Sequence, residues 1–161
     1  MDKADLLDEI RLEVGDLIDK HRKDLPLMFQ KVCSHIQRRV EDYQGVAVYL
    51  TEYPEFIRRH ESGSIGLPRV QKFGEGPLSI TAVRGGLYRE RNLNRILICI
   101  PLYLGQNVYG IFVVESNPLS QIHDEDITLF TEICSSFENR MVAYYQPDIE
   151  EPDFFDDDDL V

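Results

Sequence analysis

The segment RILICIPLYLGQNVYGIFVVES, residues 95–116, carries the strongest structural signal in the sequence. Residues 95–104 are apolar at nearly every position, which is typical of a strand buried on both faces of a sheet. The polar residues 105–107 predict a short turn, and residues 108–116 then return as the second strand of a hairpin. Gly110 lies within this return strand, where the missing side chain leaves room for a close neighbour.

Two helices and two further strands are predicted before this hairpin. Near the N-terminus, apolar residues recur at spacings of three and four among charged ones, which predicts an amphipathic helix along Leu7, Ile10, Val14 and Leu17. A second helix is predicted from about residue 26 to 40, because Asp24 can cap it and Pro26 fits its first turn. Apolar and β-branched residues then predict strands at 45–50 and 56–62.

A long helix is predicted after the hairpin. Its start is marked by acidic residues 124–126, which suit the positive end of a helix dipole. Its apolar positions alternate between spacings of three and four: Ile127, Phe130, Cys134, Phe137, Met141 and Tyr144. This seam is narrower than a helix lying on a sheet requires. Two interpretations stay open: the terminal helices cover their own sheet, or they form the helix bundle of a homodimer.

The segment FGEGPLSITAVRGG, residues 73–86, looks at first like a phosphate-binding loop. It matches neither the dinucleotide-binding fingerprint, since Ser79 stands where the third glycine belongs, nor the phosphate-loop pattern, since no Gly-Lys-Ser/Thr follows. The residues instead predict a short helix, with Pro77 in its first turn and Gly85 after its end. The first turn of such a helix offers unpaired N–H groups to an anion or a polar ligand.

Length and composition predict one domain with tails in a chain of 161 residues. No apolar run approaches the roughly 20 residues of a membrane span, and the start of the sequence is acidic, so a cytoplasmic protein without membrane contact is expected. The net charge of -12 argues against nucleic-acid binding. Residues 55–95 are locally basic, which favours a small anion or simply forms a solvated face. The three cysteines, Cys33, Cys99 and Cys134, are interpreted as buried small hydrophobic residues.

The order of elements and four segments together resemble the GAF domain family. The segments are GVAVYLTEYPEFIRRHESG, FGEGPLSITAVRGG, ICIPLYLGQNVYGIFVVES and HDEDITLFTEICSSFENRM, and the likeness covers roughly residues 25–145. The resemblance implies an α/β (α+β) fold of the GAF and PAS type: an antiparallel sheet sandwiched by helices, with terminal helices that form a dimer bundle. It divides the chain into an N-terminal helix (1–24), a GAF-like domain (25–146) and an acidic tail (147–161).

The resemblance also implies a ligand pocket between the sheet and the short middle helix. The implied ligand-binding residues are Phe73, Gly76, Ser79, Ile80, Val83, Arg84, Tyr88 and Arg95. Between the middle helix and the buried strand, the family usually has a longer segment with a strand and a lid, where this sequence has only LYRERNLN. A shortened lid implies a pocket that is small, open or absent. No cofactor or metal is expected.

Catalysis is not expected from the residues. The Asn-Lys-Phe-Asp-Glu pattern of cyclic-nucleotide-binding members of the family is absent. Another branch, the free methionine sulfoxide reductases, needs a nucleophilic and a resolving thiol in the pocket-forming segment, whereas residues 62–95 contain no cysteine. Cys99 lies in an apolar strand, where burial disfavours its thiolate. The four histidines are scattered and form no pair at metal-ligand spacing.

The sequence from 147 to 161 is predicted to be a disordered tail, because it has eight acidic residues, two prolines and no basic residue. Phe154 and Phe155 stand among the acids, so the tail either only solubilises the protein or docks on a basic, partly apolar groove of a partner or of this chain. We therefore expect a stand-alone GAF-like sensory or regulatory module. It is expected to form a homodimer and to bind either a small anionic or polar ligand or a partner protein. The alternative is a dimeric scaffold that senses nothing and recruits a partner through its tail.

Overall fold

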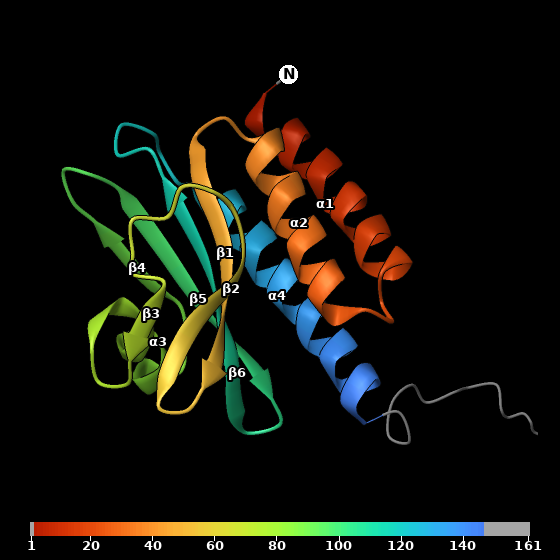
Figure 1. The fold of residues 1–161 in the computed structure, drawn as a ribbon. Helices are drawn as coiled ribbons and strands as arrows, with labels where there is room; N and C mark the ends of the chain where they lie inside the picture. The colour runs from red at the N-terminus through yellow and green to blue at the C-terminus, as the bar shows by residue number, and fades with distance from the viewer. Residues whose placement is uncertain (1, 147–161) are drawn as a thin grey trace, which may run out of the picture.

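The structure is a computed structural model that describes residues 2–146 and has helices on both faces of one sheet (Figure 1). The strands are β1 (Tyr43–Glu52), β2 (Glu55–Gly63), β3 (Val70–Lys72), β4 (Tyr88–Arg91), β5 (Ile96–Leu104) and β6 (Asn107–Ser116). They are ordered β3-β2-β1-β6-β5-β4, and every neighbouring pair is antiparallel. The predicted α+β class with an antiparallel sheet is confirmed.

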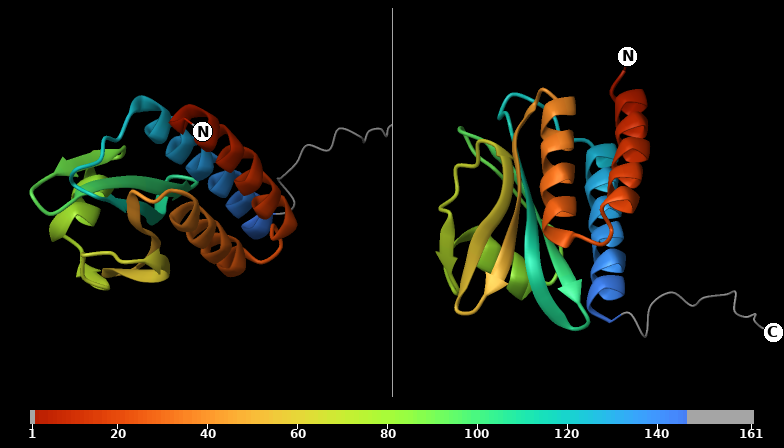
Figure 2. Two further views of the ribbon diagram at one scale, coloured as in Figure 1. Left: turned by 90° about the horizontal axis from the view of Figure 1, so that it is seen from above. Right: turned by 45° about the vertical axis from the view of Figure 1, so that its right-hand side comes forward.

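Three long helices cover one face of the sheet and a short helix covers part of the other (Figure 2). The long ones are α1 (Lys3–Lys20), α2 (Leu25–Arg39) and α4 (Asp124–Tyr145), and the short one is α3 (Gly76–Arg84). α2 packs on β1 and β2, α4 packs on β5, and α1 lies on α2 and α4. None of the helices in the described part of the chain combines the length and apolarity that crossing a membrane requires.

Strand β5 is buried on both faces, as its continuous apolar sequence predicted. Ile96, Ile98 and Ile100 point into the core beneath the three long helices, while Leu97 and Cys99 point into a smaller core beneath α3. β6 alternates in the same way, because successive side chains of a strand point to opposite faces. The sheet therefore has an apolar core on each of its faces.

Helix α1 is fixed at its start by a buried carboxylate of α4. Asp126 has no exposed surface and pairs with Lys3 Nζ at 2.7 Å. The hydroxyl of Tyr43 on β1 donates a hydrogen bond to the same carboxylate, and the backbone N–H of His123 donates another at 2.8 Å. Asp126 therefore does more than match the helix dipole, because it joins α1, α4 and the sheet.

The narrow apolar seam of α4 is used inside the chain. Phe130, Cys134, Phe137 and Met141 are all buried in the core beneath the helices, and Leu129 and Ile133 widen the seam. The seam thus has a sufficient explanation in the packing of one chain. The dimer bundle stays a prediction, as do the domain boundary at residue 24 and the tail at 147–161, which lies outside the described residues.

Two short strands were not predicted from the sequence. β3 has three residues and β4 has four, and both are edge strands with charged residues at exposed positions. The segment LYRERNLN therefore does contain a strand, β4, which pairs with β5. An alternating pattern is recognised over about four to eight residues, so β3 is too short for a signal and β4 is at the lower limit.

Candidate functional site

The glycine-framed helix α3 forms one wall of the candidate site. Its ends agree with the sequence prediction: Pro77 lies in the first turn, and Gly85 ends the helix in the left-handed conformation at φ 76°. Leu78 and Thr81 are buried against the sheet, which fixes the helix in place. Gly76 also has a positive φ of 70°, and a Cβ there would meet the side chain of Gln71 at 2.7 Å. The positive φ therefore favours glycine at this position, and any larger residue would also have to displace the Gln71 side chain.

An open hollow of about 400 Å³ lies between α3 and the hairpin ends of β1, β2 and β6. Its volume falls in the range of about 300 to 1,000 Å³ that is typical of small-molecule sites. The residues that line it come from four segments of the chain: Thr51, Phe56, Phe73, Gly74, Ser79, Ala82, Val83, Asn107 and Val108. None of them is ionisable, so the hollow itself carries no charge.

Apolar side chains make up most of the wall. Phe56 and Phe73 pack with ring centroids 4.8 Å apart, and Val83 is 89% exposed at the opening. Among the polar groups, Ser79 Oγ accepts a hydrogen bond from Gly74 N at 2.9 Å. Thr51 Oγ1 is buried and has no hydrogen-bond partner within residues 2–146. Thr51 Oγ1 is therefore a buried polar atom of the wall with unused hydrogen-bonding capacity.

A second hollow of about 450 Å³ continues the first around the exposed side of α3. The two share Gly74, Ser79 and Val83, and the second adds Gly76, Ile80 and Arg84. The Arg84 guanidinium lies 5.7 Å from the centre of the Tyr88 ring. Together the hollows form one surface whose lining is largely apolar and contains one charged side chain, Arg84.

The structure divides the eight predicted ligand-binding residues into two groups. Phe73, Ser79 and Val83 line the first hollow, and Gly76, Ile80 and Arg84 line the second, which also includes Ser79 and Val83. Tyr88 and Arg95 line neither. Tyr88 donates a hydrogen bond to Glu90 at 3.1 Å, and Arg95 forms an ion pair with the same carboxylate at 3.4 Å.

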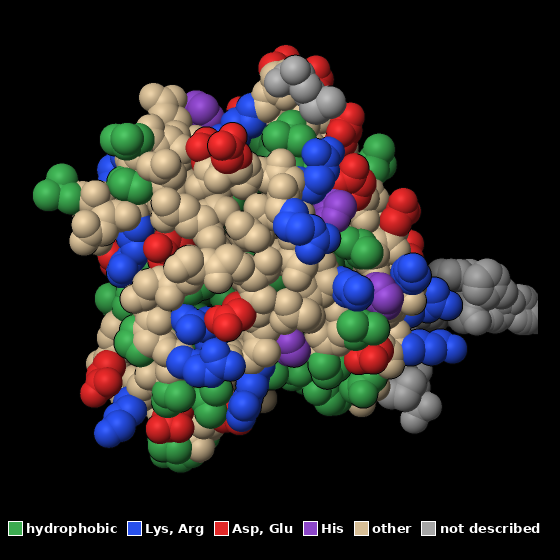
Figure 3. All heavy atoms as spheres, turned by 45° about the horizontal axis from the view of Figure 1, so that its top comes forward, with side chains coloured by type: hydrophobic (Ala, Val, Ile, Leu, Met, Phe, Trp, Pro, Cys, Tyr) green, Lys and Arg blue, Asp and Glu red, His purple; other side chains and the backbone are tan. Residues whose placement is uncertain are grey.

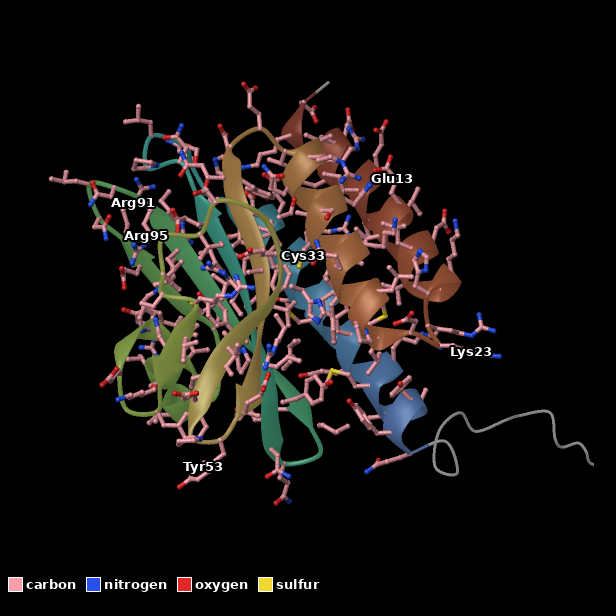
Figure 4. All side chains as sticks on the ribbon, viewed as in Figure 1. Glu13, Lys23, Cys33, Tyr53, Arg91 and Arg95 are labelled. Carbon is pink, nitrogen blue, oxygen red and sulfur yellow. The ribbon has the colours of Figure 1, made fainter. Side chains whose placement is uncertain are left out.

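Arg95 lies at the opposite end of the sheet from the hollow. Figure 4 shows Arg95 near the upper end, beside Arg91, whereas Tyr53 marks the lower end where the β1–β2 hairpin turns. Between these two ends, the α3 face of the sheet is filled by the protein itself. Tyr49 and Leu67 pack there, and the Tyr49 hydroxyl donates to Pro68 O at 2.7 Å. The segment 64–69 thus covers the middle of this face, between Arg95 and the hollow.

Sequence reasoning missed the contribution of the hairpin ends. Thr51, Phe56, Asn107 and Val108 line the hollow, yet they lie near turns far from α3 in the sequence. β1 and β6 are neighbours in the sheet, and Leu50 is paired with Gly110, which brings the two hairpins together. The sequence contains no local signal for this arrangement, because it depends on strand order.

All three cysteines are buried, as predicted. Cys33 and Cys134 lie in the core beneath the long helices, whereas Cys99 lies in the core beneath α3. Burial raises the pKa of the Cys99 thiol to about 12, although a hydrogen bond with Thr81 acts in the opposite direction. Within residues 2–146, no group of three or more His, Cys, Asp or Glu side chains is arranged to hold a metal ion.

Comparison with solved structures identifies the fold. A free methionine-R-sulfoxide reductase from Neisseria meningitidis, solved with its substrate, superposes with a TM-score of 0.80 at 19% identity over 91% of this chain and 95% of that chain. A putative GAF sensor protein from Burkholderia vietnamiensis gives 0.76 at 16% identity, covering 87% and 90%. The GAF domain of a phosphoenolpyruvate-protein phosphotransferase from Coxiella burnetii gives 0.75 at 12% identity, covering 92% and 100%. No protein-family model and no curated protein matches the sequence. The chain has a GAF-like fold, as the resemblance implied.

The sequence led to the expectation that this chain is not an enzyme, and that expectation was wrong, because enzymes are among the similar solved structures. Several of the similar solved structures are free methionine-R-sulfoxide reductases, including those of Thermoplasma acidophilum and Staphylococcus aureus. The missing cysteines of residues 62–95 and the burial of Cys99 were given too much weight, because this fold is shared by enzymes and by sensor domains. Fold alone therefore does not distinguish an enzyme from a sensor domain.

Proposed function

We propose that this protein is a sensory or regulatory module that binds an uncharged small molecule in the hollow between α3 and the hairpin ends. The observation that carries the proposal is the buried, unpartnered Thr51 Oγ1 in a wall that is otherwise largely apolar. A buried hydroxyl without a partner costs about 1 to 3 kcal/mol. A ligand with an apolar body and one polar group removes that cost and covers the exposed apolar surface.

The lining supports a neutral ligand over an anionic one. No basic side chain lines the first hollow, and a charged group moved there from water would lose hydration without gaining an ion pair. Binding requires the threonine hydroxyl to turn about χ1 into another staggered rotamer that faces the hollow. It then offers either a donor or an acceptor. Alcohols, phenols and neutral amides fit this chemistry.

The site is connected to the helical face of the sheet through β6. Asn107 and Val108 line the hollow, and the hydroxyl of the adjacent Tyr109 lies 2.9 Å from that of Tyr145 at the end of α4. The Tyr109 ring also lies 6.4 Å from that of Phe29 on α2. A ligand that shifts the start of β6 therefore changes contacts with both helices, which gives the module a route from ligand to output.

A binding screen on the full chain tests the proposal. The probes are uncharged aromatic alcohols, phenols and amides, and the readout is the chemical shift of backbone amides in NMR spectra. Val83→Asp places a charge at the opening of the hollow, and Leu93→Asp is the matched control, since Leu93 is 95% exposed and lines neither hollow. We expect binding that Val83→Asp weakens at least about tenfold and Leu93→Asp leaves unchanged. Binding that responds equally to both variants contradicts the proposal.

A second candidate, reduction of free methionine-R-sulfoxide, is favoured by the position of Cys99. It is the cysteine that lies on the α3 side of the sheet, the face that carries the hollow. With its pKa near 12, the thiol is almost fully protonated at neutral pH, so turnover requires a bound substrate to activate it. The test is consumption of methionine-R-sulfoxide with dithiothreitol as reductant. Turnover that Cys99→Ser abolishes, in a variant that unfolds at the same temperature, supports this candidate, and its absence removes it.

A further inference from the structure

The outer face of helix α3 is apolar although it faces solvent. Leu78 and Thr81 hold the inner side of the helix against the sheet. On the outer side, Val83 is 89% exposed and Ile80 is 46% exposed, and the exposed Gly76, one turn before Ile80, has no side chain. A helix with apolar side chains on both sides is typical of an element that is covered on both. The outer face of α3 is therefore suited to a partner.

Other parts of the surface give no such indication. Acidic and basic side chains are interspersed on the face of the molecule seen in Figure 3. The exposed leucines Leu12, Leu93 and Leu119 belong to α1, to the turn before β5 and to the loop after β6, and single exposed apolar residues are normal. Figure 2 shows α3 on the side of the sheet away from the three long helices, where a second molecule can approach it.

The two ends of α3 carry opposite charges. Glu75 is the exposed residue that precedes the helix, and Arg84 is its exposed last residue. Among residues 2–146, no oppositely charged side chain lies within 4.0 Å of either of them. Nine positions separate the two residues, which corresponds to about 14 Å along a helix axis. The outer face is therefore apolar in its middle, acidic at its start and basic at its end.

This arrangement of charges is complementary to itself when the helix direction is reversed. Placed antiparallel about a two-fold axis beside Ile80, two copies of α3 bring Glu75 of each opposite Arg84 of the other. The same axis brings Gly76 opposite Val83, so that the valine side chain lies where glycine leaves space. A parallel pair would instead bring like charges together at both ends.

The surface beside α3 has room for the side chains of a second copy. The second hollow, of about 450 Å³, is lined by Gly76, Ile80, Val83 and Arg84 along with Gly74 and Ser79, so most of its wall is the outer face of α3. A valine from a second copy that lies opposite Gly76 enters this hollow. The second copy thereby contributes a residue to a surface that adjoins the candidate ligand site, since both hollows include Val83.

We infer that the protein self-associates weakly through the outer face of α3, with the two helices antiparallel and with Glu75 paired to Arg84 at both ends. Two helices of nine residues form a small interface, and interfaces below about 1,200 Å² are typical of weak, transient complexes. The terminal helices take no part, so this interface differs from the helix bundle that the seam of α4 left open. The inference goes beyond the proposed function and holds whether or not the hollow binds a small molecule.

Analytical ultracentrifugation of the full chain, up to millimolar concentration, tests the inference through the charged pair. Glu75→Arg alone and Arg84→Glu alone each bring like charges together at both ends, so each is expected to weaken self-association about fivefold or more. The double variant restores opposite charges and is expected to associate like the wild type. An equimolar mixture of the two single variants is also expected to associate, because each end then joins an arginine to a glutamate.

Apolar variants distinguish this interface from one formed by the terminal helices. Val83→Asp is expected to weaken self-association at least about tenfold, because it places a charge in the apolar middle of the interface. Leu12→Asp, at a 73% exposed position of α1, is expected to leave it unchanged. A chain that stays monomeric at every concentration overturns the inference. Association that responds to Leu12→Asp and not to Val83→Asp, or that the double charge variant fails to restore, also overturns it.

Probe binding separates this inference from the proposed function. Glu75 lines neither hollow, so Glu75→Arg is expected to weaken self-association without changing the affinity for neutral aromatic probes in dilute protein. Self-association with the expected response to charge, in a chain that binds no probe, supports the inference and contradicts the ligand site. Probe binding by a chain that never self-associates overturns the inference and leaves the ligand site standing.

Discussion

The hydroxyl of Tyr43 on β1 donates a hydrogen bond to Asp126, a carboxylate with no exposed surface at the start of α4. Burial and the adjacent Asp126 charge both raise the pKa of Tyr43, which keeps its hydroxyl protonated as the donor. Lys3 neutralises the carboxylate from α1 at 2.7 Å. One acidic side chain therefore holds the N-terminal helix, the last helix and the sheet together.

Replacing this carboxylate is expected to destabilise the protein strongly. Asp126→Ala leaves the Tyr43 hydroxyl buried without a partner and removes the pairing of Lys3, which costs about 2 to 4 kcal/mol. Asp124→Ala, at an exposed site of the same first turn, is expected to cost less than about 1 kcal/mol. Urea unfolding of both variants measures the difference. Equal costs would show that Asp126 acts only through the helix dipole.

Two glycine-to-alanine substitutions are expected to have opposite signs. A Cβ on Gly110 would lie 2.4 Å from Tyr49 O, a backbone atom that cannot move away, so Gly110→Ala is expected to destabilise by about 1 to 3 kcal/mol. Gly15 lies inside α1, and a methyl group on its Cα would meet no atom within 4 Å beyond its chain neighbours and the backbone of its own helix, so Gly15→Ala is expected to stabilise by about 0.5 to 1 kcal/mol. Thermal unfolding of the two variants checks both directions. A stabilising Gly110→Ala is incompatible with the strand pairing described.

His60 is expected to make stability depend on pH. Burial lowers the pKa of His60, and Arg59 lowers it further. Below the unfolded pKa of about 6.5, the unfolded chain binds a proton that the folded chain resists, so stability falls as the pH falls from about 7 to 5. His60→Gln is expected to remove this part of the pH dependence. Urea unfolding of wild type and variant at several pH values measures it, and identical pH profiles would contradict the prediction.

Cys99 is expected to react slowly with thiol reagents in the folded protein. Its side chain has no exposed surface and its pKa is raised to about 12, so little thiolate forms at neutral pH. Labelling with a maleimide at pH 7 is expected to be complete only after unfolding, as for Cys33 and Cys134, which are also buried. A probe or substrate that accelerates labelling of Cys99 alone would indicate that the core beneath α3 opens on binding. Rapid labelling without any ligand would contradict the burial of Cys99.

The sequence predicted the elements that have a strong local signal, whether an apolar run, a periodic seam or flanking glycines. The continuous apolar run 95–104, the apolar seam of α4 and the glycines around α3 each produced the element that was predicted. β3 and β4 were not predicted, because three residues give no pattern and four are at the lower limit. The seam of α4 left two interpretations open, packing within one chain or a homodimer bundle; Phe130, Cys134, Phe137 and Met141 are buried within this chain, and the homodimer stays a prediction.

The candidate site was predictable on the α3 side and not on the other. Phe73, Ser79 and Val83 lie in or beside the glycine-framed helix, where the family resemblance placed the pocket. Thr51 and Asn107 were missed because strand order, not sequence proximity, brings the two hairpins to α3. Arg95 lies at the other end of the sheet from this hollow, so its role in ligand binding stays a prediction. The covering segment 64–69 could not be placed without tertiary structure.

The most direct test of the ligand site is the affinity of the full chain for a neutral aromatic alcohol, compared with that of Thr51→Val, by titration of amide chemical shifts. The variant keeps the shape of the wall and removes only the unpartnered hydroxyl. One net hydrogen bond contributes about 0.5 to 1.5 kcal/mol, so we predict binding that is weakened about two- to tenfold, with shifts centred on Thr51, Val83 and Val108 in the wild type. Unchanged affinity, or shifts that fall away from these residues, would contradict the proposed site.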